Sequence, residues 1–250
     1  MATLTTGLDK LISAGAVSVA DCTSFYLRKG KRLFDTSGAL VALIITSPLM
    51  LLCTLLVRLT SRGPVLFRQT RVGRYGRPFT ILKFRTLLEG SEALGSSLVL
   101  PCDPRLTPVG FFLRRTKLDE MPQFVNVLRG DMSLVGPRPR VPTEVDATNP
   151  LDRILQGVRP GVTSYATAHH HMEADYCARY SDPQAAHRGL LPQKRSLDCE
   201  YLLNMSFLLD LKLLMLTLVL LYFPCRSPGT LECERGSVPA DSILDRVLER

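Results

Sequence analysis

The sequence predicts an α/β domain seated on a membrane by an apolar helical segment. Three observations support this prediction: an uncharged run over residues 38–57, two short β-rich segments after a turn at Arg62-Gly63-Pro64, and helical periodicity over residues 111–128. A chain of 250 residues fits one such domain with appendages. In chain order we expect a lead-in over residues 1–30, a membrane segment over residues 31–62, a folded domain over residues 63–223 and a peripheral tail over residues 224–250.

The composition narrows the choice of partners. A formal net charge of +8 favours an anionic partner, which is a nucleic acid, a phosphorylated small molecule or a lipid surface. Nucleic acid is the weakest of these, because the chain has no zinc-finger spacing, no RNP-like aromatic motif and no tryptophan. The seven cysteines are scattered without a Cys-x-x-Cys pair, which indicates reduced thiols facing a cytoplasm. The first residues lack the pattern of a cleavable signal, so we expect no export.

The uncharged run is long enough to form a membrane-spanning helix. Basic residues flank both of its ends. Because such residues favour the cytoplasm, we expect neither end to be translocated. At Ser47-Pro48 the proline removes a backbone donor and leaves the Ile44 carbonyl without its usual partner, which the Ser47 hydroxyl can replace. We therefore expect a re-entrant helix-break-helix over residues 31–62 that bends at Ser47 and Pro48. The alternative is a kinked helix that crosses the membrane once.

A second apolar stretch covers residues 201–223 and contains Asn204, Asp210 and Lys212. Its uncharged remainder, residues 213–223, is too short to cross a bilayer. We expect an interfacial helix that lies on the bilayer or on the first segment, and simple core packing explains the stretch equally well. Between the two apolar stretches, residues 65–67 and 79–82 have the composition of strands around a turn at residues 73–78.

Two adjacent acids, Asp119 and Glu120, follow a basic segment and precede the stiff sequence Pro-Arg-Pro-Arg at residues 137–140. Thr116 with Asp119 three residues later fits a capping box at a helix start, where an ionised, nucleophilic carboxylate is favoured and phosphate is attracted. Neighbouring helical residues point about 100° apart, so the two acids are expected to have separate roles. Carboxylates among guanidinium groups predict chemistry on a phosphate ester. The alternative is an ordinary capping box with a solvated acid.

Several motifs follow one another in a characteristic order. They are Lys31-Arg32-Leu33-Phe34-Asp35, Ser47-Pro48, Lys83-Phe84-Arg85-Thr86, Asp103-Pro104-Arg105, Leu118-Asp119-Glu120-Met121-Pro122-Gln123 and Gly130-Asp131-Met132-Ser133-Leu134-Val135-Gly136-Pro137-Arg138-Pro139. In this order they resemble the bacterial sugar transferases, the monotopic phosphoglycosyl transferases. The resemblance is strong over residues 31–145 and looser over residues 154–218. It implies a small membrane-seated α/β catalytic domain with a re-entrant helical hairpin and interfacial amphipathic helices.

The resemblance also implies an activity. Such an enzyme transfers a sugar 1-phosphate from a UDP-sugar to polyprenyl (undecaprenyl) phosphate and releases UMP, as the membrane-committed first step of glycan or exopolysaccharide assembly. Asp119 would be the nucleophile and form a phosphosugar-aspartate intermediate, and Mg²⁺ would bind Asp119 and Glu120. The catalytic domain would lie on the cytoplasmic face of the inner (cytoplasmic) membrane. Rival interpretations are a non-catalytic membrane-bound interaction protein of a glycan assembly complex and a transferase of different chemistry.

Further residues receive roles from the same resemblance. Arg114 would brace the lipid or sugar phosphate, and Arg138, stiffened by its flanking prolines, would present its planar fork to the nucleotide diphosphate. Lys83, Arg85 and Arg105 would contact phosphate, or else form ion pairs that stabilise the fold. The UDP-sugar, the glycan pathway and the oligomeric state cannot be predicted from these residues.

The chain departs from the family pattern in two places. Leu87 replaces a methionine of similar volume, a change of small consequence. Residues 164–171 replace a stretch that usually contains glycine and glutamine, and they include His169, His170 and His171. Because neighbouring residues rarely converge on one metal ion, we expect a polar loop here. We expect this altered segment to bear on recognition of the sugar or nucleotide.

Overall fold

The computed structural model describes residue 26 and residues 30–91, 98–101, 103–170 and 173–222. The predicted lead-in and tail therefore lie almost entirely outside the described residues. The helices are α2 (Lys31–Thr60), α3 (Pro108–Arg115), α4 (Gln123–Arg129), α5 (Pro150–Leu155), α6 (Tyr165–His169), α7 (Glu173–Cys177), α8 (Pro183–Leu203) and α9 (Phe207–Tyr222), with short 3₁₀ turns η3 (Arg74–Gly76), η5 (Leu118–Glu120) and η6 (Pro142–Glu144). The strands are β1 (Leu66–Val72), β2 (Pro78–Phe84), β3 (Ser133–Val135) and β4 (Gly161–Thr163). The described chain is thus mixed and mostly helical, which confirms the predicted class.

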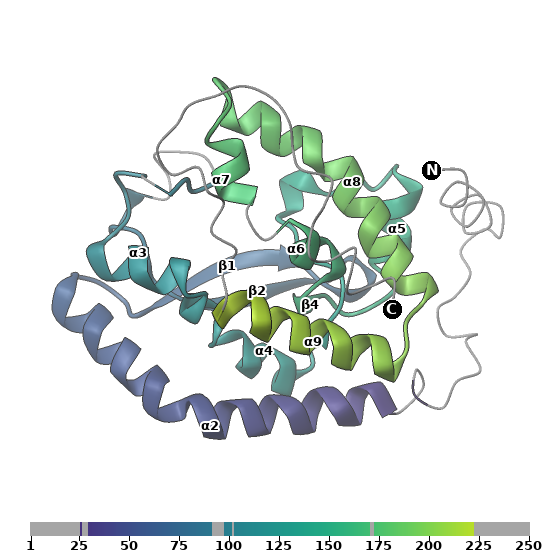
Figure 1. Ribbon diagram of the computed structural model, residues 1–250, viewed down its shortest axis with the longest axis horizontal. Coiled ribbons are helices and arrows are strands. Elements are labelled where there is room, and N and C mark those ends of the chain that lie inside the picture. The colour runs from purple at the N-terminus through teal and green to yellow at the C-terminus, as the bar shows by residue number, and fades with distance from the viewer. Residues whose placement is uncertain (1–25, 27–29, 92–97, 102, 171–172, 223–250) are drawn as a thin grey trace.

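Helix α2 runs along one side of the molecule and bends partway along its length (Figure 1). Pro48 lies inside it, and the Ser47 hydroxyl donates to the Ile44 carbonyl at 2.8 Å, the replacement bond expected from the sequence. The helix nevertheless continues through Pro48 over its 30 residues, so it is not interrupted at the predicted break. By length and composition, α2 is the one helix among the described residues that is able to cross a membrane.

Both ends of α2 are fixed to the same folded domain. Near its start, Arg32 donates to the carbonyls of Val127 and Leu128 at the end of α4, at 2.7 and 3.1 Å. Just beyond its other end, Ser61 accepts hydrogen bonds from the Arg85 guanidinium. The apolar side chains between the two ends are largely exposed, among them Val41, Ile44, Ile45, Leu51 and Leu52.

The two predicted strands form an antiparallel hairpin, longer than expected, in which Leu66 pairs with Phe84 and Val72 pairs with Pro78. Strands β3 and β4 form a separate parallel pair. At the end of that pair the backbones approach so closely that a Cβ atom on Gly136 would lie 2.6 Å from the Arg159 carbonyl oxygen. Glycine is therefore required where β3 leads into the Pro-Arg-Pro segment.

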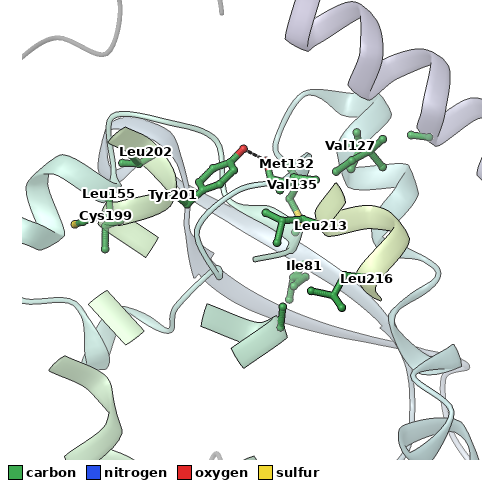
Figure 2. Close-up of a cluster of buried hydrophobic side chains, with 13 residues drawn as sticks. Ile81, Val127, Met132, Val135, Leu155, Cys199, Tyr201, Leu202, Leu213 and Leu216 are labelled. Carbon is green, nitrogen blue, oxygen red and sulfur yellow. Dashed lines mark hydrogen bonds between the residues drawn. The ribbon is translucent and has the colours of Figure 1, made fainter. Parts of the chain in front are cut away.

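The main hydrophobic core joins α2, β2, α4, β3, α8 and α9 (Figure 2). Within it the Tyr201 hydroxyl contacts the Val135 carbonyl at 3.3 Å and donates to Asp210 at 2.7 Å. Asp210 is fully buried and also binds the amine of Lys31, at 2.7 Å, so α9 is tied to the start of α2.

Helix α9 has two apolar sides. Leu213 and Leu216 point into the core, whereas Leu208, Met215 and Leu218 are exposed. Core packing is therefore confirmed for one side of α9, and contact of the other side with a bilayer stays a prediction. One side packs in the core and the other remains available to a bilayer.

Candidate active site

A sharp turn, rather than a helix start, positions the acid pair. The expected helix over residues 111–128 is split, because Lys117 adopts a left-handed conformation with φ of 56°. The Thr116 hydroxyl donates back to the Phe112 carbonyl at 2.8 Å, so it does not cap a following helix. The predicted capping box of Thr116 with Asp119 is therefore wrong, and Asp119 and Glu120 lie in η5 between α3 and α4.

Glu120 is held by two cations. Its Oε1 atom lies 2.6 Å from the Lys83 amine and 2.6 Å from Arg138 Nη2, while its Oε2 atom accepts from Arg138 Nη1 at 3.2 Å. Burial favours the neutral acid, but Arg138 and Lys83 outweigh it and hold the pKa of Glu120 well below its usual range. Glu120 is therefore an ionised anchor, and burial lowers the pKa of Lys83 at the same place.

Asp119 has a different environment. It is only 4% exposed, and its Oδ1 atom has no hydrogen-bond partner within the described part of the chain. Burial raises its pKa, although Lys83 and Arg114 act in the opposite direction. This corrects the expectation that a helix end favours its ionised form. Two neighbouring acids with opposite pKa shifts are typical of acids with separate roles.

Arg114, at the end of α3, extends toward the acids. Its Nε atom donates to the Thr86 hydroxyl at 2.9 Å, and burial lowers the pKa of its guanidinium while Asp119 raises it. Thr86 is itself buried, and its carbonyl accepts from the backbone of Thr107 at 2.9 Å. No role was predicted for Thr86, since the sequence carries no signal of what a threonine hydroxyl contacts.

A residue of α8 holds the backbone of Arg138. Its backbone N–H donates to Asp198 at 3.2 Å, and Asp198 also accepts from the backbone of Ala166 at 3.2 Å. Burial raises the pKa of Asp198 to about 6. The guanidinium fork that the sequence assigned to a diphosphate is bound to Glu120.

The three remaining predicted cations have separate locations. Lys83 joins the acid pair. Arg105 forms a two-bond pair with Asp103, at 2.9 and 2.7 Å, which favours its structural interpretation. Arg85 is 3% exposed and donates to Ser61 at the end of α2.

The histidine segment is a short helix rather than the expected loop. Ser164 caps α6 by accepting from the Thr167 backbone at 2.9 Å, and His169 and His170 lie at its end. His171 lies outside the described residues. Among the described residues, no group of three or more metal-ligating side chains comes together.

Sequence reasoning missed two further residues. Gln123 is fully buried, and within the described chain neither polar atom of its amide has a partner. His187 lies 2.7 Å from Glu173 and 3.7 Å from Glu144, and links α8 to α7 and η6. These hydrogen bonds raise the pKa of His187 to about 9. Its partners are 14 and 43 residues away in the chain, so no local pattern indicates the cluster.

Comparisons with known proteins identify the family of the chain. The model of the family described as bacterial sugar transferase matches residues 26–223. Over 187 residues the chain is 37% identical to EpsL of Bacillus subtilis (strain 168), described as an uncharacterized sugar transferase, and this match covers 75% of the chain and 84% of EpsL.

Two longer relatives carry more specific names. The chain is 44% identical over 148 residues to UDP-N-acetylgalactosamine-undecaprenyl-phosphate N-acetylgalactosaminephosphotransferase of Aeromonas hydrophila, a match that covers 58% of the chain and 35% of that protein. It is 36% identical over 194 residues to UDP-glucose:undecaprenyl-phosphate glucose-1-phosphate transferase of Escherichia coli (strain K12), covering 75% of the chain and 39% of that protein. The matches thus span well under half of these two relatives. On the family match, the protein is a member of the bacterial sugar transferase family.

Proposed function

We propose that the protein transfers a sugar 1-phosphate from a UDP-sugar to polyprenyl (undecaprenyl) phosphate and releases UMP. One observation carries the proposal: within the described residues, Asp119 has a buried carboxylate oxygen without a hydrogen-bond partner, next to Glu120, which two cations hold in its ionised form. A nucleophile needs a free oxygen, and the leaving phosphate needs nearby positive charge. Names of relatives such as the Escherichia coli transferase describe the same class of reaction.

The proposed reaction has two displacements at phosphorus. Asp119, as the carboxylate, attacks the phosphorus that bears the sugar, and the bond to the UMP oxygen breaks with its electron pair leaving on UMP. An oxygen of the lipid phosphate then attacks the same phosphorus, and Asp119 departs as a carboxylate. Arg114 and Lys83 stabilise the charge on the phosphoryl oxygens, and Arg138 holds Glu120 in place beside them.

Magnesium would be held by Asp119 through the carboxylate oxygen that does not attack phosphorus, rather than by the acid pair. Both Glu120 oxygens accept hydrogen bonds from Arg138, and one also binds Lys83, whereas Asp119 Oδ1 has no partner within the described residues. Mg²⁺ usually binds one or two carboxylates together with substrate phosphates. When bound, it supplies charge that neutralises the diphosphate.

The same proposal places α2 in the membrane as a re-entrant helix. A helix of 30 residues is about 45 Å long, so an upright spanning helix would carry one end to the far side. Both ends of α2, however, are bound to one domain, through Arg32 and Ser61. A bent helix whose exposed middle enters the bilayer satisfies both facts. Basic residues at both flanks favour the cytoplasmic face of the inner membrane.

A competing function is a non-catalytic interaction protein of a glycan assembly complex, which the unusual segment at residues 164–171 favours. Purified protein would be mixed with membranes that contain polyprenyl phosphate and with a panel of UDP-sugars, and UMP release measured. The enzyme hypothesis predicts release with at least one sugar. Folded protein that releases no UMP across a broad panel would instead support the interaction protein, and release of another product would indicate different chemistry.

A further inference from the structure

A groove of about 700 Å³ lies where the chain leaves α2 and enters β1. Pro64, Val65 and Phe67 form apolar walls, and Arg85 and Glu89 contribute the charged lining. Leu59, the penultimate residue of α2, is 80% exposed. The groove therefore lies just beyond the C-terminal end of α2, whose exposed apolar side chains continue to Leu59.

Arg85 is the unusual feature of this groove. Its side chain is almost completely buried, yet only its Nη2 atom is paired, with the Ser61 carbonyl at 2.9 Å and the Ser61 hydroxyl at 2.8 Å. Its Nε and Nη1 atoms have no partner in the described part of the chain. A buried guanidinium with two unpaired donors is unfavourable by itself, and an anion is the ligand that satisfies both donors together.

The groove is close to the acid pair. The Arg85 N–H donates to the Val65 carbonyl at 2.9 Å and so extends the hairpin ladder by one residue. Side chains two residues apart on a strand share a face and are separated by about 7 Å. Lys83, two residues before Arg85, contacts Glu120 at 2.6 Å. Arg85 thus lies between Ser61, at the C-terminal end of α2, and Lys83, which contacts the acids.

Glu89 is the opposing charge in the groove. Gly63, with φ of +105°, has no side chain at a position where a Cβ atom would collide with both Arg85 Nη1 and Glu89 Oε2. The two charged groups therefore face the same small space. Glu89 is exposed at the groove edge, so its carboxylate repels any anion that approaches Arg85.

We propose that this groove is the acceptor subsite, in which Arg85 binds the phosphate monoester of a polyprenyl phosphate. Nε and Nη1 donate to the phosphate oxygens, and Val65 and Phe67 contact the first isoprene units. Glu89 weakens this binding and so permits release of the product. The inference rests on the proposed function, because it assigns one of the two substrates of that reaction.

Kinetics with both substrates varied separately test the assignment. Arg85→Gln is expected to raise the KM for polyprenyl phosphate at least about tenfold and the KM for UDP-sugar by less than about twofold. Glu89→Gln is expected to lower the KM for polyprenyl phosphate. Arg188→Gln, at an exposed site on α8, is the matched control and should change neither value. A rise in the UDP-sugar KM without a change in the lipid KM would overturn the proposal.

Vesicle binding separates the sources of phosphate and is independent of turnover. Vesicles of phosphatidylcholine alone, with polyprenyl phosphate or with phosphatidylglycerol would be sedimented with wild-type and Arg85→Gln protein. Polyprenyl phosphate alone should increase binding in an Arg85-dependent way, and inorganic phosphate should compete weakly. An equal Arg85-dependent gain with phosphatidylglycerol would overturn the acceptor assignment in favour of a general headgroup site.

Two outcomes need separate interpretation. If no UDP-sugar yields UMP, the proposed function fails, and loss of polyprenyl phosphate binding in Arg85→Gln would still support the groove as a phosphate subsite. If Arg85→Gln does not fold, the affinity of the exposed Glu89→Gln variant for polyprenyl phosphate tests the proposal instead. An unchanged affinity for polyprenyl phosphate in that variant would contradict the proposal.

Discussion

The guanidinium group of Arg138 donates two hydrogen bonds to the carboxylate of Glu120, at 2.6 and 3.2 Å. This pair joins the segment after β3 to η5, and Lys83 completes it from β2. Because Glu120 is committed to these cations, its neighbour Asp119 is the acid with an oxygen that no described residue binds. The separate roles of the acids follow from this arrangement.

Replacing Arg138 with lysine tests the paired geometry. A lysine keeps the charge but presents a point charge in place of a planar fork. We expect Arg138→Lys to lower kcat/KM by about tenfold or more and to raise the KM for UDP-sugar, since one charge-assisted hydrogen bond contributes about 1.5–3 kcal/mol. Arg188→Lys, at a solvent-exposed pair, is the control. Unchanged steady-state kinetics for Arg138→Lys would show that the fork is dispensable.

Thr86 provides a test of how Arg114 is oriented. Thr86→Val keeps the shape but removes the acceptor of Arg114 Nε, whereas Thr86→Ser keeps the hydroxyl. We expect kcat to fall about tenfold in the valine variant, in line with the loss of a hydrogen bond to a charged group, and to recover in the serine variant. Equal kcat values in the two variants, at equal thermal stability, would rule out this positioning role.

Local patterns predicted the hairpin and the replacement bond at Ser47, because both depend on residues close together in the chain. The turn at residues 73–78 and the flanking β-rich segments specify β1 and β2. Ser47 is three residues from Ile44, so the fate of that carbonyl follows from helix geometry alone. The assignment of Asp119 and Glu120 as the catalytic acids stays a prediction.

Contacts between distant segments were beyond prediction. The capping box was wrong because Lys117 takes a left-handed conformation, which few non-glycine residues adopt and no neighbour indicates. The raised pKa of Asp119 comes from burial that several elements create together. The partners of Arg138 and of His187 are set by packing of α8, and no spacing in the sequence encodes that packing.

The His187 cluster predicts a pH-dependent stability. The folded-state pKa of His187 is about 9, above its ordinary value of 6.5, so its contribution is complete below about pH 6.5 and is lost as the pH rises through 9. We expect His187→Gln to lower Tm by several degrees at about pH 6, and to have little effect at about pH 10. Thermal denaturation of both proteins across this range measures the difference. A Tm deficit that does not vary with pH would contradict the charged pair.

The re-entrant placement of α2 predicts accessibility from one side only. Single cysteines at Leu33 and at Arg62 should both resist an impermeant thiol reagent applied outside intact cells, with the parent protein as background control. Pro48→Leu restores the helical hydrogen-bond ladder and should expose one of the two sites. Labelling of one site only, in the protein that retains Pro48, would establish a single span.

Asp119→Asn is expected to abolish turnover, because an amide cannot form the acyl phosphate. Its stability should not fall, since the raised pKa of Asp119 means that burying the charged carboxylate opposes folding at neutral pH. Activity assays and Tm measurements on the same preparation check both statements. A large drop in Tm would mean that lost activity reflects unfolding.

The covalent intermediate is the central claim, and intact-protein mass spectrometry tests it most directly. Protein incubated with the accepted UDP-sugar and no lipid should gain the mass of one sugar phosphate, mapped by peptide analysis to Asp119. The adduct should disappear when polyprenyl phosphate is added and should never form on Asp119→Asn. An adduct on another residue, or full turnover by Asp119→Asn, would contradict the account.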